Sequence, residues 1–303
     1  MDTKILLENG TNELEVLEFT LNGNHYGINV AKIREILSYQ PVTPVPNASD
    51  KVEGIFMPRD TMITVISLKK CMNLPDDAET KGLFIITNFN KLDIAFHVDE
   101  VIGINRVSWG DIIKPDKTMN TGDTGVSTGV VKLGDKLVII LDFEQIVTEI
   151  SPETGLKVTD IDALGERKRD DSPIVMAEDS PLLAKLISDC LRKAGYTNLH
   201  LNENGQEAWD LLKSYKDAGN IDDNVHCIIT DIEMPVMDGH RLTKLVKEDP
   251  DLHHVPLIIF SSLVNEEMRK KGEALGADAQ LTKPEIGQLV ETVDKLIAKS
   301  KSK

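Results

Sequence analysis

The chain has 303 residues, a formal net charge of −16 and an apolar content of 41%. This length exceeds that of a usual single domain and predicts two domains. The negative charge argues against a nucleic-acid partner, because an acidic surface repels phosphate backbones. No apolar run approaches the roughly 20 residues that cross a bilayer, and the acidic start does not resemble a secretion signal. We therefore expect a cytoplasmic protein that is not inserted into a membrane.

The cysteines predict neither a disulfide framework nor a zinc site. Cys71, Cys190 and Cys227 lie far apart in the sequence. They form no CxxC pair and no Cys/His spacing that is typical of zinc. We expect three reduced thiols.

Short apolar runs separated by turn residues dominate residues 1–150. Val30–Leu37 is expected to be a helix because its apolar residues fall on one helical face. A second helix is expected after Asp142, which would cap its N-terminus. The expected strands are Leu14–Leu21, Thr61–Ile66, Leu83–Ile86 and Leu137–Leu141. Many short strands at close spacing predict an all-β first half, built as barrels or as a sandwich.

Residues 151–171 are polar, contain Pro152, Gly155 and Gly165, and show no sustained period. Such a stretch is typical of a linker, with or without a short helix of its own. The basic cluster at residues 166–169 is followed directly by two aspartates. We expect this cluster to be a solvated part of the linker.

Residues 172–303 show strands that alternate with helices. The strands are expected at Ile174–Ala177, Leu199–Leu201, Val225–Thr230, Leu257–Phe260 and Asp278–Leu281. The helices are expected at Pro181–Ala194, Gly205–Tyr215, Gly239–Glu248, Asn265–Leu275 and Ile286–Ala298. Five such units in about 130 residues predict an α/β domain with a doubly wound, five-stranded parallel sheet.

Polar side chains follow the strands of this second half at their carboxyl ends. Glu178 and Asp179 follow the first strand, Asp231 the third, Ser261 the fourth and Lys283 the fifth. Because function in an open parallel sheet lies at the carboxyl ends of the strands, we expect these groups to converge. Two carboxylates about 4 Å apart repel each other by about 4 kcal/mol at an effective dielectric constant of about 20. The cluster therefore needs a cation, and oxygen ligands without His or Cys favour Mg²⁺.

An acidic residue at a strand end has a second interpretation, as the N-cap of the following helix. Asp179 or Asp231 alone would fit that role. An acid pair, an aspartate, a hydroxyl and a lysine on successive elements favour a site instead.

This half resembles the receiver domains of bacterial two-component response regulators over nearly all of Ser172–Lys303. The pattern D-x-x-M-P-x-M-D-G at Asp231–Gly239 carries the resemblance most specifically, with support from Val175–Ser180, Phe260–Ser262 and Thr282–Pro284. The resemblance implies a flavodoxin-like fold in which Asp231 accepts a phosphoryl group from a histidine kinase and forms an acyl phosphate.

The same resemblance implies a role for each group of the cluster. Ser261 would donate a hydrogen bond to a phosphoryl oxygen and Lys283 would form an ion pair with the phosphoryl group. Such an arrangement suits phosphoryl transfer, which needs an oriented acceptor and cations near the equatorial oxygens. The implied Mg²⁺ ligands are Glu178, Asp179, Asp231 and the backbone carbonyl of Glu233.

One position departs from the receiver pattern. Receivers commonly carry an aromatic residue three positions before the lysine, and that residue reorients on phosphorylation. Here the position holds Gln280. We therefore expect the coupling from Asp231 to the distal face of the domain to be small.

Residues 1–150 contain no catalytic triad, metal cluster or phosphate loop that the sequence reveals. From about Asn12 to Ile150 they resemble the CheW-like coupling domains of bacterial chemotaxis. The segments that carry the resemblance are Glu18–Val30, Lys32–Leu37, Val52–Arg59 and Ala95–Ile102. It implies paired SH3-like barrels that bridge the cytoplasmic tips of chemoreceptors to a histidine kinase without catalysis.

The signature of this coupling family differs in part from the chain. The family usually has asparagine-leucine-arginine-glycine where this chain has Met57-Pro58-Arg59-Asp60. Arg59 matches the arginine of the signature, and we expect it to contact the receptor or the kinase. The alternative is an arginine that only pairs with a nearby acid.

Together the halves resemble chemotaxis coupling proteins in which a receiver follows a CheW-like domain. This implies a non-enzymatic adaptor at chemoreceptor arrays, regulated by phosphorylation of Asp231, which also loses its phosphate by autodephosphorylation. Two alternatives stay open, a phosphate sink for the kinase and an aspartyl-phosphate hydrolase. The hydrolase is disfavoured because its D-x-D-x-T signature normally follows the first strand, whereas Asp231 follows the third.

Overall fold

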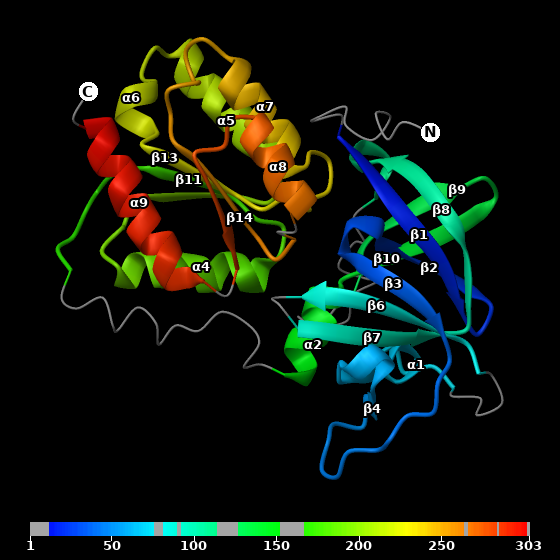
Figure 1. The fold of residues 1–303 in the computed structure, drawn as a ribbon. Helices are drawn as coiled ribbons and strands as arrows, with labels where there is room; N and C mark the ends of the chain where they lie inside the picture. Colours follow the sequence, from blue (N-terminus) through cyan, green and yellow to red (C-terminus); the bar gives the residue numbers. More distant parts are fainter. Residues whose placement is uncertain are drawn as a thin grey trace. The chain divides into compact units, whose positions relative to one another are not determined.

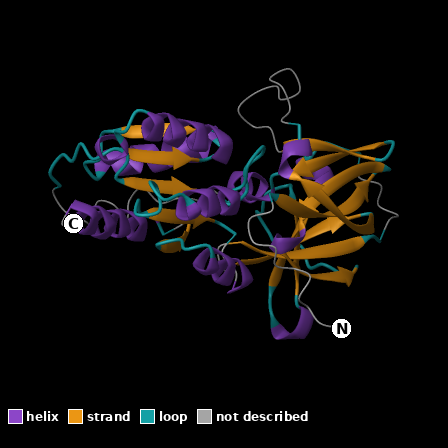
Figure 2. Ribbon diagram, turned by 90° about the horizontal axis from the view of Figure 1, so that it is seen from above, coloured by secondary structure: helices purple, strands orange, loops and turns teal. Residues whose placement is uncertain are grey.

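The computed structural model describes residues 12–75, 81–89, 92–113, 127–151, 167–263, 266–283 and 285–301. The chain divides into two compact units, of which the first spans Leu14–Thr154 and the second contains the described residues from 167 onward. Figure 2 shows the contrast between them, since strands dominate the first half and helices alternate with strands in the second. Each unit is described by itself.

The first unit contains two five-stranded sheets. One has the order β8-β1-β2-β10-β9, with β1 Glu13–Leu21, β2 Asn24–Asn29, β8 Glu100–Ser108, β9 Ser127–Leu133 and β10 Lys136–Leu141. The other has the order β3-β6-β7-β5-β4, with β3 Ile33–Ser38, β4 Val52–Phe56, β5 Ile63–Ser67, β6 Leu83–Phe89 and β7 Leu92–Val98. The prediction of an all-β first half is confirmed.

Aromatic side chains fill the core of the first unit. Phe19, Phe96 and Phe143 are fully buried, and the rings of Phe96 and Phe143 meet edge to face with centroids 4.6 Å apart. Phe143 opens helix α2 (Phe143–Ile150), whose N-cap is Asp142, as predicted. The Asp142 carboxylate accepts a hydrogen bond from the backbone N–H of Gln145 at 2.9 Å. The helix therefore closes the first unit against its core.

The prediction of a helix at Val30–Leu37 is wrong. Only Val30–Lys32 forms a short 3₁₀ turn, and β3 begins at Ile33. β3 pairs antiparallel with β6, where Ile36 lies opposite Ile85. The β-branched residues of this segment pack well on a pleated surface, and the neighbouring strand supplies hydrogen bonds that outweigh a weak helical pattern.

The second unit is the predicted doubly wound α/β domain. Its parallel sheet has the order β12-β11-β13-β14-β15, with β11 Ile174–Ala177, β12 Leu199–Asn202, β13 Cys227–Thr230, β14 Leu257–Ser261 and β15 Ala279–Thr282. Its helices are α4 Pro181–Lys193, α5 Gly205–Asp217, α6 Ile221–Asn224, α7 Gly239–Glu248, α8 Glu266–Ala274 and α9 Ile286–Lys301. Figure 1 shows α4 and α9 on one face of the sheet and α5, α7 and α8 on the other. Only the short α6 was not predicted.

The expectation that the basic cluster is fully solvated is wrong for Arg167. Its guanidinium group bonds to both carboxylate oxygens of Asp294 on α9, and its Nε donates to the Ala194 carbonyl at 2.8 Å. The hydroxyl of the buried Tyr196 donates to the same carboxylate at 2.6 Å. Arg169 does remain exposed. The chain is thus tied to the receiver-like unit from residue 167 onward.

All three cysteines are free, and all three are buried. Burial raises the pKa of Cys71 and of Cys190 to about 11 and that of Cys227 to about 12. Cys71 lies in the first unit and the other two lie in the second. At neutral pH these groups are thiols rather than thiolates.

Candidate functional site

The carboxyl edge of the parallel sheet brings the predicted side chains together. β11 and β13 are adjacent and in register, with Ala177 opposite Thr230, so the residues that follow them lie side by side. These residues are Glu178 and Asp231, and the Asp231 N–H donates to the Ala177 carbonyl at 3.0 Å. The strand order therefore places two acidic side chains at one point of the edge.

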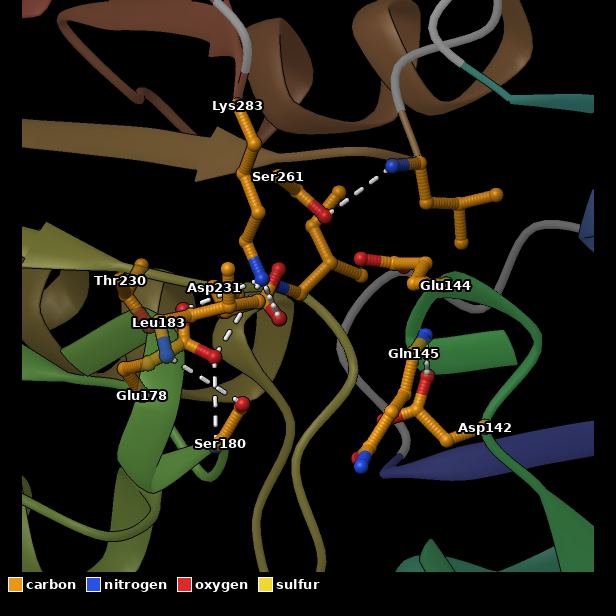
Figure 3. Close-up of polar contacts among 12 residues, drawn as sticks. Asp142, Glu144, Gln145, Glu178, Ser180, Leu183, Thr230, Asp231, Ser261 and Lys283 are labelled. Atoms are coloured by element: carbon orange, nitrogen blue, oxygen red, sulfur yellow. Dashed lines mark hydrogen bonds and ion pairs between the residues drawn. The ribbon is translucent and has the colours of Figure 1, made fainter. Parts of the chain in front are cut away.

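Lys283 follows β15 at the same edge of the sheet, and its side chain reaches both acids (Figure 3). Its Nζ lies 2.8 Å from Oδ2 of Asp231 and 3.0 Å from Oε2 of Glu178. The three residues are at most 5% exposed. A buried charge is stable only when it is paired and hydrogen-bonded, and here one ammonium group serves two carboxylates.

Asp179 adds a third carboxylate to the cluster. One carboxylate oxygen from each of Glu178, Asp179 and Asp231 lies within 4.8 Å of the others. Burial, followed by the charges of Asp231 and Asp179, raises the pKa of Glu178 well above its usual range, and Lys283 opposes this rise. Hard oxygen donors that carry an excess of negative charge match the preference of Mg²⁺, so the residues present fit such an ion.

The backbone around Asp231 is closely packed. Oδ1 of Asp231 accepts a hydrogen bond from the Ile232 N–H at 2.6 Å, which orients the carboxylate. Gly239 lies so close that a Cβ atom there would stand 1.8 Å from the Asp231 carbonyl oxygen. Asp238 is the N-cap of α7 and accepts from the Arg241 N–H at 2.6 Å. The loop after β13 thus fixes the position of Asp231.

Ser261 lies at the same edge but is not bonded to the acids. It is buried at the end of β14, and its Oγ accepts a hydrogen bond from the Leu263 N–H at 3.2 Å. Glu233 is half-buried two residues after Asp231. The structure thus places both predicted residues near Asp231 and shows a local partner for the serine that the sequence did not reveal. Pro284, next to Lys283, lies outside the described residues.

Arg59 belongs to the first unit, whereas this cluster belongs to the second. Its side chain is 76% exposed, and its guanidinium group forms an ion pair with Glu35 at 3.0 Å. Arg59 and Asp60 both have left-handed backbone conformations, with φ of 49° and 63°. The residue is therefore both accessible and paired, so both interpretations of the sequence remain compatible with its position.

In the described part of the chain, no helix is long and apolar enough to cross a membrane.

Comparisons with known families divide the chain in the same way as its fold. The model of the CheW-like domain matches residues 15–151, and that of the response regulator receiver domain matches residues 174–294. The solved scaffolding protein TtCheW from Thermoanaerobacter tengcongensis is 26% identical, with a TM-score of 0.40, over 42% of this chain and 88% of its own. A receiver domain of a signal transduction histidine kinase from Syntrophus aciditrophicus is 30% identical, with a TM-score of 0.37, over 42% and 90%.

One relative matches both halves at once. The chemotaxis protein CheV3 of Helicobacter pylori is 28% identical over 304 residues, which covers 95% of this chain and 96% of the relative. Two further CheV proteins of the same organism match about as much of the chain, at 27% and 25% identity. The chain thus joins a CheW-like domain to a response regulator receiver domain, and it is similar to CheV chemotaxis proteins over nearly their whole length.

Proposed function

We propose that this chemotaxis coupling protein links chemoreceptors to a histidine kinase through its first half, and that phosphorylation of Asp231 regulates this link. The observation that carries the proposal is the buried cluster of Asp231, Glu178 and Lys283 at the carboxyl edge of the sheet. In the same chain, a CheW-like half offers a non-catalytic binding surface.

Phosphoryl transfer follows from the positions of the side chains. An Asp231 carboxylate oxygen attacks the phosphorus of a phosphohistidine, the new O–P bond forms as the P–N bond breaks, and the imidazole leaves with the electron pair. Mg²⁺, when bound by Glu178, Asp179, Asp231 and the Glu233 carbonyl, supplies positive charge near the equatorial oxygens. Lys283 forms an ion pair with the phosphoryl group, and Ser261 donates a hydrogen bond to it. Water later hydrolyses the acyl phosphate.

Three features support this assignment of roles. Lys283 already lies 2.8 Å from Asp231, so it needs little movement to follow a phosphoryl group on that residue. The Ser261 hydroxyl accepts rather than donates in its bond to Leu263, so its proton remains available. The Ile232 N–H binds Oδ1 of Asp231, and Oδ2 faces the ammonium group of Lys283.

Arg59 is proposed as the contact with the receptor or the kinase. Its exposed guanidinium group pairs with a single acid in the described structure. An exposed ion pair contributes about 0–1 kcal/mol, so exchanging Glu35 for a partner's carboxylate costs little. We further propose that the protein acts in the cytoplasm at receptor arrays, because its proposed partners are the cytoplasmic tips of receptors and the kinase.

Reconstitution with receptor and kinase tests the proposed function. Kinase activity is compared for the full-length protein and for Asp231→Asn in the presence of Mg²⁺ and ATP. We expect the intact protein to change kinase output when it is phosphorylated and the variant to support coupling without that change. If both proteins support coupling equally but only the intact one drains phosphate from the kinase, the receiver is a phosphate sink. Steady hydrolysis of small phosphomonoesters would indicate an enzyme instead.

A further inference from the structure

Helix α8 is docked on the sheet with little apolar packing. Gly272 is the one buried residue among the nine of this helix, all of which the structure describes, and it has no side chain to bury. The same face adds Met268 and Lys271, which are half-buried. Because apolar burial stabilises packing roughly in proportion to its area, a face centred on a glycine and a lysine contributes little. A polar contact therefore matters for the docking of this helix.

Gln280 supplies a contact at this place. Its Nε2 donates a hydrogen bond from β15 to the Arg269 carbonyl of α8 at 2.7 Å. The amide group lies against bare helix backbone, since a Cβ atom on Gly272 would stand 2.4 Å from Oε1 and 2.6 Å from Cδ of Gln280. Any side chain at position 272 would displace this amide group.

The contact satisfies only one half of the amide. Oε1 of Gln280 is buried and has no hydrogen-bond partner among the residues that the structure describes. A buried polar atom without a partner costs free energy, and water would restore its hydrogen bond if α8 moved away. The contact thus holds α8 and is at the same time easy to open.

The position of Gln280 connects this contact to the phosphoacceptor site. β14 and β15 are in register, with Ile259 opposite Gln280 and Ser261 opposite Thr282. The Ser261 hydroxyl accepts from the Leu263 N–H, and Leu263 precedes α8 by three residues. A change in the hydrogen bond of Ser261 therefore acts on the start of α8, while Gln280 holds its middle.

We propose that the Gln280–Arg269 contact is a latch that keeps α8 on the sheet of the unphosphorylated receiver. The latch opens when Ser261 turns away from Leu263 toward a phosphoryl group on Asp231, a step that rests on the proposed function. Gln280 is then a positioning residue for α8. The phosphorylation signal leaves the site by movement of the whole helix.

Hydrogen exchange of the full-length protein without a phosphodonor tests the latch itself. We expect the amides of α8 to exchange about tenfold faster in Gln280→Ala and in Gly272→Ala, because both changes remove the same contact from opposite sides. The α9 amides serve as a reference for intact folding. Gln206→Ala is the matched control, since the Gln206 amide bonds to Asp210 on the same helix, α5, away from α8 in the chain.

The glycine variant makes the test strict. Alanine is a better helix former than glycine, so Gly272→Ala would slow exchange in α8 if docking did not depend on Gln280. Slower exchange in that variant, or unchanged exchange in Gln280→Ala, overturns the latch. Faster exchange in both, with α9 unchanged, supports it.

A second experiment tests the opening of the latch. Mg²⁺ and beryllofluoride are added to the wild type, and exchange is followed in α8 and in the loop 232–239 after Asp231. We expect protection of the loop and faster exchange in α8, with no further acceleration in Gln280→Ala. A protected loop with an unchanged α8 overturns the opening step. No change in the loop shows that the proposed phosphoacceptor role fails and removes the opening step with it, while the first experiment still decides whether the contact holds α8.

Discussion

Each half of the molecule contains a buried lysine that forms ion pairs, and the two sites differ in the number of carboxylates that face the lysine. In the first half, Nζ of Lys69 lies 2.8 Å from Oδ1 of Asp99, and the other oxygen of Asp99 accepts from the Asn22 N–H at 2.7 Å. One cation meets one anion, and the anion is further satisfied by the backbone. Such a pair is a structural element.

In the second half, one lysine faces a surplus of negative charge. Lys283 pairs with Glu178 and Asp231, and Asp179 completes the acidic cluster. Burial of Lys69 and Lys283 is similar, at 7% and 4% exposure. Burial of a charge therefore does not by itself mark a functional site. An excess of like charge that needs a further ion does.

The largest expected effect separates Asp231 from Asp99, the two aspartates that pair with Lys283 and Lys69. Asp231→Asn should abolish labelling of the protein by Mg²⁺ and a small phosphodonor, because the amide is not a nucleophile for phosphorus. Asp99→Asn, the matched change in the first half, should leave labelling intact. Phosphate incorporation measured by mass spectrometry checks both. Label that persists on the Asp231 variant would remove the assignment of the phosphoacceptor.

The two lysines should respond differently to Mg²⁺. Lys69→Met should lower the free energy of unfolding of the first half by about 1–3 kcal/mol, since it removes the cation that pairs with the half-buried Asp99, and Mg²⁺ should not restore it. Lys283→Met should destabilise the second half without Mg²⁺ and recover when the ion is added.

The tryptophans make this measurement possible. Trp109 lies in the first half and Trp209 in the second, so Trp109→Phe and Trp209→Phe each leave a single fluorophore. Urea unfolding of these proteins, followed by fluorescence, reports one half at a time. If Mg²⁺ rescues both lysine variants, or neither, the contrast between a structural pair and a cation site is wrong.

Two glycines, Gly239 and Gly103, differ in how closely other atoms pack against them. Gly239→Ala should destabilise the second half by about 1–3 kcal/mol, because the new Cβ overlaps the Asp231 carbonyl and forces the loop to shift. Gly103→Ala on β8 should change the first half little, since no atom lies within 4 Å of the added Cβ. Thermal unfolding of the two variants measures the difference. Equal midpoints would show that the loop after β13 yields easily.

Two exposed arginines test which half meets the partners. Arg59→Glu should weaken binding of the full-length protein to the receptor–kinase complex by about tenfold, or about 1.4 kcal/mol, without lowering the unfolding midpoint. Arg169→Glu is the control, because that side chain is similarly exposed and paired with an aspartate in the second half. Titration calorimetry measures both affinities. Unchanged affinity for the Arg59 variant would leave it as a residue that only pairs with Glu35.

The smallest expected effect is a pH dependence of the first half. Burial lowers the pKa of His97, but the Glu53 carboxylate, 2.8 Å from Nδ1, outweighs burial and holds that pKa above its usual value. A raised folded-state pKa stabilises fully below the unfolded value of about 6.5, and this contribution is lost as the pH rises through the folded pKa. The gain is less than about 1 kcal/mol because the pair is partly solvated.

Glu53→Gln tests this pair. The variant should have a lower unfolding midpoint than the wild type at about pH 6 and nearly the same midpoint at about pH 9. Glu149→Gln, which removes an ion pair with Lys51, is the control and should show no such trend between these values. A constant difference across the range would assign no protonated state to His97.

Much of the second half could be predicted from its sequence, because its local signals agree with its fold. Ser180 and Asn204 cap the helices that follow them, and the Asn204 side chain accepts from the Glu207 N–H at 2.9 Å. The parallel topology then requires the residues after β11 and β13 to meet, so the approach of Glu178 to Asp231 needed no knowledge of side-chain conformations.

Other features depend on tertiary contacts that no local pattern encodes. The segment after Val30 became a strand because β6 lies beside it. The partners of Ser261 and Gln280 depend on rotamers, and the left-handed backbone of Arg59 depends on the turn between β4 and β5. The prediction that Arg167 is solvated was wrong because its partner, Asp294, lies 127 positions further along the chain.

The buried thiols turn the two halves into separate chemical reporters. Only the thiolate form of a cysteine attacks a thiol-reactive dye, and burial suppresses this form in Cys71, Cys190 and Cys227 of the folded protein. Modification of Cys71 therefore requires the first half to open, and modification of the other two requires the second half to open. The rate of alkylation at each cysteine, read by peptide mass, reports the opening of each half in one unmodified sequence.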